Sequence, residues 1–246
     1  MVVELLFVGV FIGGVAGFFG IGGGIVLIPI LLLLGYDTKD AIGISIIQMV
    51  FSSLYGSYLN FKKGSLIIND GISIGLGGFI GGFIGGYTTS FIPDILLKFL
   101  FIGLLLFAIF RLFFSKIVEN DDEIISINRW ILFSIGLLIG IFSISLGIGG
   151  AIILTPLLVG FIHYPIKKAV SAGLFFIAFS SVSGLISRFL TGTIDLHDGL
   201  IVAISSLLGV LFGIYLKEKI SSKNHKVALL LLYSFALLIL IKKIFL

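Results

Sequence analysis

Residues 18–29 of the chain read FFGIGGGIVLIP, and residues 145–156 read SLGIGGAIILTP, so a glycine cluster followed by an apolar run and a proline occurs twice. The glycines and the proline keep the same register at an offset of 127 residues. Farther along, the offset becomes 128, because FSSLYG at 51–56 corresponds to FSSVSG at 179–184. Similarity that recurs in order along the chain indicates an internal duplication.

The duplication divides the 246-residue chain into two membrane repeats and a linker. We assign residues 1–115 to the first repeat and residues 129–246 to the second. The segment between them, 116–128, carries four carboxylates within five residues and is the charged linker.

The composition excludes a soluble protein. Hydrophobic residues make up 59% of the chain, charged residues only 11%, and the mean hydropathy is +1.28. A soluble domain carries about 25% charged residues, so this chain cannot cover a water-facing surface. The absence of cysteine excludes disulfides and thiolate metal sites. We expect an all-α, multi-pass integral protein of the cell membrane.

The apolar runs predict the membrane segments. They lie at 2–34, 41–61, 71–90 and 95–114 in the first repeat, and at 130–162, 169–190, 199–216 and 227–246 in the second. A spanning helix needs about 20 residues, so the first run of each repeat is too long. Glycine is a poor helix former, and the glycine clusters should break these runs. Each repeat is therefore a glycine-tipped broken helix or re-entrant hairpin followed by three transmembrane helices.

Lysine and arginine residues favour one path for the broken segment, because cytoplasmic loops are enriched in them. A segment that crosses once leaves eight basic residues at each side of the membrane. A segment that enters and leaves on one side places eleven on the linker's side and five opposite. The second path makes the repeats inverted, with the linker in the cytoplasm and both termini outside. Two full crossings have the same parity, but the short second piece favours the hairpin.

The glycine clusters are the first candidate site. A non-helical tip at membrane depth must face protein or a water-filled cavity. The helices that start at these tips would present unpaired N–H groups and a positive dipole end, which favour an anion. The candidate residues are Gly20, Gly22, Gly23, Gly24, Gly147, Gly149 and Gly150. The alternative is close helix packing. An anion site predicts that Gly23→Ala and Gly150→Ala keep the fold and lose the substrate.

Polar residues in the helices after the hairpins complete the candidate substrate site. They are Ser45, Gln48, Ser52, Ser180 and Ser181. Interhelical hydrogen bonding is the alternative role for these side chains.

Arg188 is a further candidate, because a basic residue inside a span is unfavourable unless it reaches water or a partner. The alternative is that the Arg188 side chain extends to the membrane–water interface.

Other polar and small residues receive structural roles. The glycine pairs at 77–78, 81–82 and 85–86 recur every four residues and predict close helix packing. Asp70 and Asp198 are expected to be helix N-caps. We assign the three histidines no role, and we expect no metal site.

The sequence is similar to the TauE/SafE family of membrane permeases, also called the sulfite exporter or toluene-sulfonate uptake family. The resemblance covers essentially the whole chain and rests on 17–24 with Pro29, on 36–43, and on 147–150 with Pro156. It implies a duplicated permease for anionic sulfur compounds such as sulfite and organosulfonates. Ala151 departs from the pattern, because the first copy has Gly24 there.

Together these observations predict a secondary transporter that moves a small anion, a sulfur oxyanion or organosulfonate, by alternating access. It needs no cofactor and is not an enzyme, since the spans lack clusters of ionisable groups. No ATP-binding motif is present, so the substrate gradient or a coupled proton or sodium ion must drive transport. The expected partners are the anion and the lipid bilayer, with no nucleic acid. An anion channel and a structural or assembly subunit are the alternatives.

Overall fold

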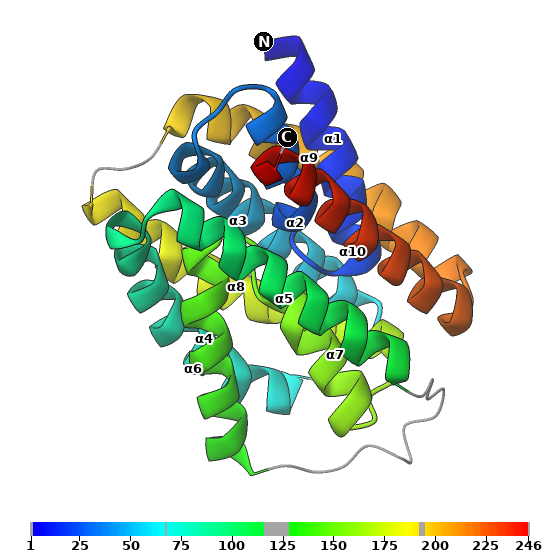
Figure 1. Ribbon diagram of the computed structural model, residues 1–246. Coiled ribbons are helices and arrows are strands. Elements are labelled where there is room, and N and C mark those ends of the chain that lie inside the picture. The colour runs from blue at the N-terminus through cyan, green and yellow to red at the C-terminus, as the bar shows by residue number, and fades with distance from the viewer. Residues whose placement is uncertain (1, 67, 116–127, 192–194, 246) are drawn as a thin grey trace.

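The protein is a bundle of helices in a computed structural model (Figure 1). The structure describes residues 2–66, 68–115, 128–191 and 195–245, with the side chains of 68–70 and 243–245 left out. The first repeat contains α1 (Val2–Phe19), α2 (Gly24–Leu33), α3 (Thr38–Lys62), α4 (Ile68–Thr88), the short 3₁₀ helix η1 (Thr89–Phe91) and α5 (Asp94–Phe114). The second contains α6 (Arg129–Ser145), α7 (Ala151–Phe161), α8 (Ile166–Leu190), α9 (Leu196–Lys219) and α10 (Ser222–Phe245).

The apolar runs correctly predicted these helices, including the breaks at the glycine clusters. Six helices of the described chain are long and apolar enough to span a membrane, namely α1, α3, α5, α8, α9 and α10. The helices after the breaks are much shorter, with 10 residues in α2 and 11 in α7. At about 1.5 Å per residue they reach only about half of a 30 Å hydrocarbon layer. This length agrees with the hairpin rather than with two full crossings. The linker residues 116–127 lie outside the described part.

The first hairpin, α1 and α2, opens at one end of the molecule. α1 runs parallel to α9: a Cβ on Gly9 would touch Ser205, and one on Gly17 would touch Val210. The start of α1 therefore lies beside the start of α9. The chain returns to this end after α2, because the Tyr36 hydroxyl donates a hydrogen bond to the carboxylate of Asp198 in the first turn of α9.

The second hairpin, α6 and α7, opens at the opposite end. α6 runs parallel to α4, since a Cβ on Gly77 would touch the Phe133 carbonyl and one on Gly85 would touch the Ile141 carbonyl. α4 starts where α3 has crossed the bundle. The end of α7 lies there too, with the Arg111 guanidinium of α5 3.9 Å from the ring centre of Phe161. Each hairpin thus packs against a helix of the other repeat.

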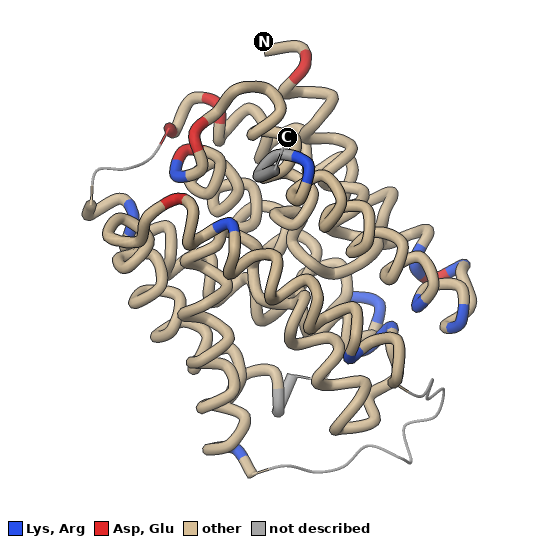
Figure 2. Tube along the Cα trace, in the orientation of Figure 1, with Lys and Arg blue, Asp and Glu red and all other residues tan. Residues whose placement is uncertain are grey.

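Charge divides the two ends of the bundle (Figure 2). We call the end with the start of α1 the acidic end and the opposite end the basic end. By their places at the helix ends, the acidic end carries Glu4, Asp37, Asp40, Asp94, Asp195 and Asp198, together with Lys39, Lys98, Arg188 and Lys242. The basic end carries Lys62, Lys63, Arg111, Arg129, Lys167, Lys168, Lys217, Lys219, Lys223 and Lys226, together with Glu218. The lysines and arginines therefore gather where the second hairpin opens.

The paired glycines of α4 pack helices closely, as the sequence predicts. Gly81 lies against α6, where a Cβ would sit 2.1 Å from the Leu137 carbonyl oxygen. Gly82 lies against α8, where a Cβ would sit 2.3 Å from the Ser180 carbonyl oxygen. The two glycines of each pair thus serve two different neighbours. Without side chains, they let three backbones approach one another.

The capping prediction for Asp198 is wrong. Asp195 is the N-cap of α9, because its side chain accepts a hydrogen bond from the Asp198 backbone N–H. The Asp198 carboxylate accepts the hydrogen bond of Tyr36 instead. Burial and this carboxylate raise the pKa of Tyr36, so its phenol stays a donor. The side chain of Asp70 lies outside the described part of the structure.

Candidate functional site

The two glycine tips meet inside the bundle. Six of their glycines have positive φ, from +68° at Gly147 to +92° at Gly23, which is the left-handed region that glycine enters without strain. A Cβ on Gly24 would lie 2.1 Å from the Gly147 carbonyl oxygen. The hydroxyl of Ser45 donates to that same oxygen at 2.7 Å. The tip of one repeat is therefore held directly against the tip of the other.

Two equivalent side chains pack against both tips. Met49 of α3 and Ile177 of α8 occupy matching positions in the repeats, since 49 + 128 = 177. Both touch the tips: a Cβ on Gly22 would lie about 3 Å from each of them, and so would one on Gly149. The tips are packed in this structure, and an anion that reaches them must move these side chains.

Gln48 is a polar side chain beside the start of α2. It is fully buried, and a Cβ on Gly23, the residue before α2, would lie 3.0 Å from Gln48 Oε1. Within the described structure neither polar atom of this amide has a hydrogen-bond partner. An unpaired buried amide is unfavourable by about 1–3 kcal/mol.

The corresponding position in the second repeat is apolar. Phe176 replaces Gln48, and a Cβ on Gly150 would lie 2.5 Å from its ring. The opposite side of each tip is equivalent in the two repeats: a Cβ on Gly23 would touch Ile12, and one on Gly150 would touch Ile139. The position that carries an amide at the first tip therefore carries an aromatic ring at the second.

The substitution of Ala151 for Gly24 is accommodated by a second difference. Gly24 faces Ser45, whereas Ala151 faces Gly173, the residue that corresponds to Ser45. Compared with the first repeat, the second has an additional methyl at Ala151 and lacks a side chain at Gly173. The departure of Ala151 from the family pattern therefore leaves the geometry of the tips similar.

The remaining predicted serines lie near the tips to different degrees. Ser52 reaches the first tip, with its hydroxyl 3.5 Å from the Gly22 carbonyl oxygen. Ser180 donates to the Ile177 carbonyl within its own helix, at 3.4 Å. Ser181 is fully buried.

Arg188 does not belong to the tips. Its guanidinium donates to the Lys39 carbonyl at 2.9 Å, in the first turn of α3 at the acidic end. Arg188 is fully buried, so it does not extend to an exposed interface either. The sequence placed it near the end of its helix, but only the tertiary structure shows that it is buried against the start of α3.

Sequence reasoning missed two buried hydroxyls beside the second tip. Ser143 Oγ lies 2.9 Å from a Cβ on Gly150, and Thr155 Oγ1 lies 3.4 Å from a Cβ on Gly173. Neither oxygen has a partner among the described residues. Thr155 lies within the repeated motif, where the first copy has Ile28, and this exchange was the available signal.

The chemistry of the tips suits an anion. The first turn of a helix leaves its N–H groups without intrahelical partners, and the helix dipole adds positive potential there. α2 and α7 both start at the tips, and the Nε2 group of Gln48, which has no partner in the described structure, can add N–H donors. Among the described residues, no group of three or more histidine, aspartate or glutamate side chains could hold a metal ion.

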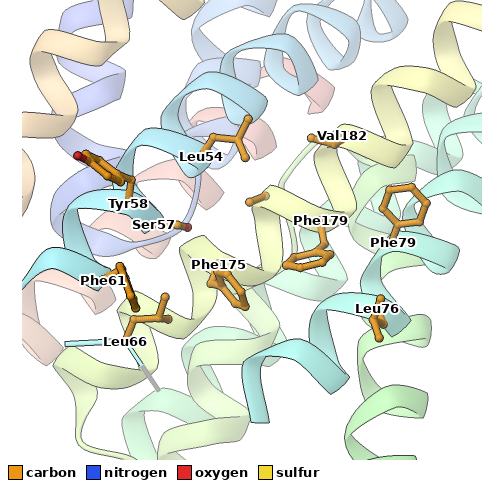
Figure 3. Close-up of a pocket in the computed structure, with 11 residues that line it drawn as sticks. Leu54, Ser57, Tyr58, Phe61, Leu66, Leu76, Phe79, Phe175, Phe179 and Val182 are labelled. Carbon is orange, nitrogen blue, oxygen red and sulfur yellow. The ribbon is translucent and has the colours of Figure 1, made fainter. Parts of the chain in front are cut away.

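A separate apolar cavity of about 690 Å³ lies between α3, α4 and α8 (Figure 3). Aromatic and aliphatic side chains line it, including Phe175 and Phe179 of α8 and Tyr58 of α3. The polar groups among the lining residues are the hydroxyls of Ser57 and Tyr58. This cavity has no cationic lining and does not suit a small anion.

Comparisons with known proteins identify the family. The chain matches the family "Sulfite exporter TauE/SafE" over residues 5–240. It is 30% identical over 243 residues to "Probable membrane transporter protein MJ0441" of Methanocaldococcus jannaschii, covering 92% of this chain and 90% of the relative. It is 28% identical over 225 residues to "Probable membrane transporter protein YdhB" of Bacillus subtilis, covering 89% of each.

A third relative, "Probable membrane transporter protein YunE" of Bacillus subtilis, is 26% identical over 267 residues, covering 97% of this chain and 95% of that one. No solved structure matches the chain. The family match over nearly the whole length, the transporter relatives and the six candidate spans lead to one conclusion: the chain is a multi-pass membrane transporter of the TauE/SafE family.

Proposed function

We propose that the protein is a secondary transporter for a small anion, a sulfur oxyanion or organosulfonate, which binds at the glycine tips. The observation that carries this proposal is the Gln48 amide, fully buried and unpartnered within the described structure, beside the start of α2. A helix start and a neutral amide together offer N–H donors without a fixed counterion. Such a site holds an anion and can also release it.

Alternating access is the mechanism that this architecture supports. The two hairpins open at opposite ends, and their tips meet around Met49 and Ile177. In inverted repeats, rocking of one half against the other opens a central site to each side in turn. The basic end faces the cytoplasm in this proposal, because lysine and arginine gather there.

The substrate class follows from the family name, which refers to sulfite, and from the chemistry of the tips. Sulfite and sulfonates present several oxygens that accept hydrogen bonds from backbone N–H groups at once. Carboxylates present fewer. We therefore expect sulfite or methanesulfonate to bind more tightly than acetate.

Gln48→Met tests the site, because methionine matches the glutamine in length and removes only its polar atoms. If Gln48 binds the anion, the variant keeps or gains thermal stability without anion, since an unpaired buried amide is removed. It should lose tenfold or more in affinity, about 1.4 kcal/mol. The measurements are the shift in Tm caused by sulfite, methanesulfonate, thiosulfate and acetate, and counterflow uptake by preloaded proteoliposomes.

Ser57→Ala is the matched control, because it removes another buried hydroxyl of α3 that is unpartnered in the described structure and lies away from the tips. It should leave anion binding and counterflow unchanged. A well-folded Gln48→Met protein with normal anion-dependent Tm shifts and uptake contradicts the proposed site. Anion flux without saturable counterflow supports a channel instead.

A further inference from the structure

Lys217 is a fully buried cation that the glycine-tip site does not use. Its Nζ atom, near the end of α9, lies 2.7 Å from Oδ1 of Asn60 in α3 and 2.9 Å from Oγ of Ser171 in α8. Asn60 and Ser171 are fully buried as well. Three helices from both repeats thus bring a positive charge and two polar side chains together inside the bundle.

This cluster lies between the first glycine tip and the basic end. Ser171 follows Val170, whose carbonyl oxygen would lie 2.3 Å from a Cβ on Gly20. Gly213, one helical turn before Lys217, lies against the backbone at the end of α1, where a Cβ would sit 2.6 Å from Phe18 N. An anion that leaves the first tip toward the basic end would therefore meet this cluster.

The cluster has more donors than acceptors. Because Oδ1 of Asn60 accepts from Lys217, the amide orientation is fixed and Nδ2 is left as a donor. In the described part of the chain, Nδ2 has no hydrogen-bond partner. A free amide donor beside a lysine ammonium suits an oxygen of an anion, and it is unfavourable without one.

Glu218 supplies a counterion that an incoming anion can replace. Its carboxylate lies 3.4 Å from Lys217 Nζ, and its side chain is 38% exposed. A partly exposed carboxylate can turn to water when another anion takes its place, because water solvates the released charge. Glu218 therefore balances the charge of Lys217 when no anion is bound, and it can give up this position when an anion arrives.

The duplication places a buried cation at each end of the route. Asn60 corresponds to Arg188, since 60 + 128 = 188, and Lys217 corresponds to Thr89, since 217 − 128 = 89. Arg188 is fully buried beside the Lys39 carbonyl at the acidic end. Among the described residues, Arg188 and Lys217 are the fully buried arginine and lysine. At the basic end the cation, Lys217, is on α9 and Asn60 is on α3. At the acidic end the cation, Arg188, is on α8, which is the counterpart of α3.

We propose that Lys217, Asn60 and Ser171 form an anion-binding station between the glycine tips and the basic end. The station binds the small oxyanion or sulfonate that the tips transport. The bound anion replaces the Glu218 carboxylate beside Lys217. The inference rests on the proposed function and adds a second binding position to it. It predicts that the cluster opens to anions from the basic end.

Charge-selective labelling tests the station in this cysteine-free chain. Ser171→Cys is nearly isosteric and places a thiol beside Lys217. The thiolate attacks a methanethiosulfonate reagent, forms a mixed disulfide and releases methanesulfinate. The protein in nanodiscs, with both ends accessible, is treated with the anionic ethylsulfonate reagent or the cationic ethyltrimethylammonium reagent. The rates are normalised to those of Ser221→Cys, which is exposed at the basic end.

We expect the anionic reagent to react at least tenfold faster than the cationic one at Ser171→Cys. Adding Lys217→Gln should abolish the preference, while Lys219→Gln, an equal charge change at an exposed position two residues away, should preserve it. Glu218→Gln should increase the anionic rate. Ser65→Cys is a second reporter, since the Ser65 hydroxyl lies 3.2 Å from that of Ser171.

Absence of reaction with either reagent at both reporters overturns the station, because anions then do not reach it. A reaction without charge preference, or a preference that survives Lys217→Gln, also overturns it. These outcomes do not involve the glycine tips, and a normal Gln48→Met transporter would not alter them. The two proposals therefore fail separately.

Discussion

Ser45 and Gly173 occupy equivalent positions in the two repeats, yet one carries a side chain and the other does not. The hydroxyl of Ser45 donates to the Gly147 carbonyl of the opposite tip. A Cβ on Gly173 would lie 2.8 Å from the Ala151 Cβ and 3.0 Å from the Gly20 carbonyl oxygen. The contact between the tips is therefore conserved in place but differs in side-chain volume.

A double-mutant cycle can show that these residues compensate each other. Gly173→Ser alone should destabilise the protein by about 1–3 kcal/mol, because the added side chain overlaps Ala151. In Ala151→Gly/Gly173→Ser the space is restored, and the introduced hydroxyl can donate to the Gly20 carbonyl. We expect the double variant to be more stable than the sum of the single effects, measured as Tm in detergent. Additive losses would show that the two positions are independent.

The left-handed glycines allow strain and steric overlap to be separated. Gly23 and Gly35 both have φ above +90°, but a Cβ on Gly23 would lie 2.4 Å from Ile12, whereas one on Gly35 meets nothing within 4 Å. Gly35→Ala should cost about 1–2 kcal/mol from φ alone. Gly23→Ala should cost about 1–3 kcal/mol more. Equal losses of thermal stability would contradict the packing seen at the tip.

This geometry also argues against the expectation that Gly23→Ala and Gly150→Ala leave the fold intact. A Cβ on Gly150 would lie within 3 Å of Phe176, Ile139 and Ser143. Lost transport in these variants would combine a lost site with lost packing. Gln48→Met avoids this ambiguity because it adds no atoms to a full space.

At the scale of elements, close glycine contacts join each repeat to the other. α1 lies along α9 through Gly9, Gly13 and Gly17 on one side and Gly209 and Gly213 on the other. Within a bilayer, helices gain no hydrophobic free energy by leaving lipid for one another. Close backbone approach and van der Waals contact must therefore hold these pairs together.

Neighbouring glycines of α1 test this packing directly. A Cβ on Gly13 would lie 1.9 Å from the Ser206 carbonyl oxygen, whereas the nearest atom to one on Gly14 is 3.8 Å away. Gly13→Ala should separate α1 from α9 and sharply reduce the yield of monodisperse protein. Gly14→Ala should retain the yield, because alanine fits there and is more favourable than glycine in a helix by about 1 kcal/mol. Size-exclusion profiles of both variants provide the measurement, and similar profiles would contradict the contact.

At the scale of the whole molecule, the segregation of charge predicts the orientation. Lys219 is exposed at the basic end, and His197 has a side chain 77% exposed at the acidic end. In intact cells, an impermeant thiol reagent added outside should label His197→Cys and spare Lys219→Cys, because basic loops stay in the cytoplasm. The reverse pattern would invert the orientation. Labelling of both from one side would contradict the assignment of the two ends.

Much of the architecture was already determined by sequence alone. The duplication, the helix boundaries and the breaks at the glycine clusters depend on local properties: helix length, glycine content and hydropathy. Those properties act within one segment, so a single sequence is sufficient to reveal them. The paired glycines of α4 likewise indicated close packing without a known neighbour.

Tertiary structure decided which of these features meet. Gln48 and Arg188 both looked like polar residues inside spans, but Gln48 lies beside the start of α2 and Arg188 donates to a carbonyl in the first turn of α3. Lys217 looked like an ordinary loop charge until Asn60 and Ser171, more than forty residues away in sequence, enclosed it. Burial and hydrogen-bond partners depend on contacts between distant segments, and here the packing of α3 on α2, α8 and α9 sets those contacts.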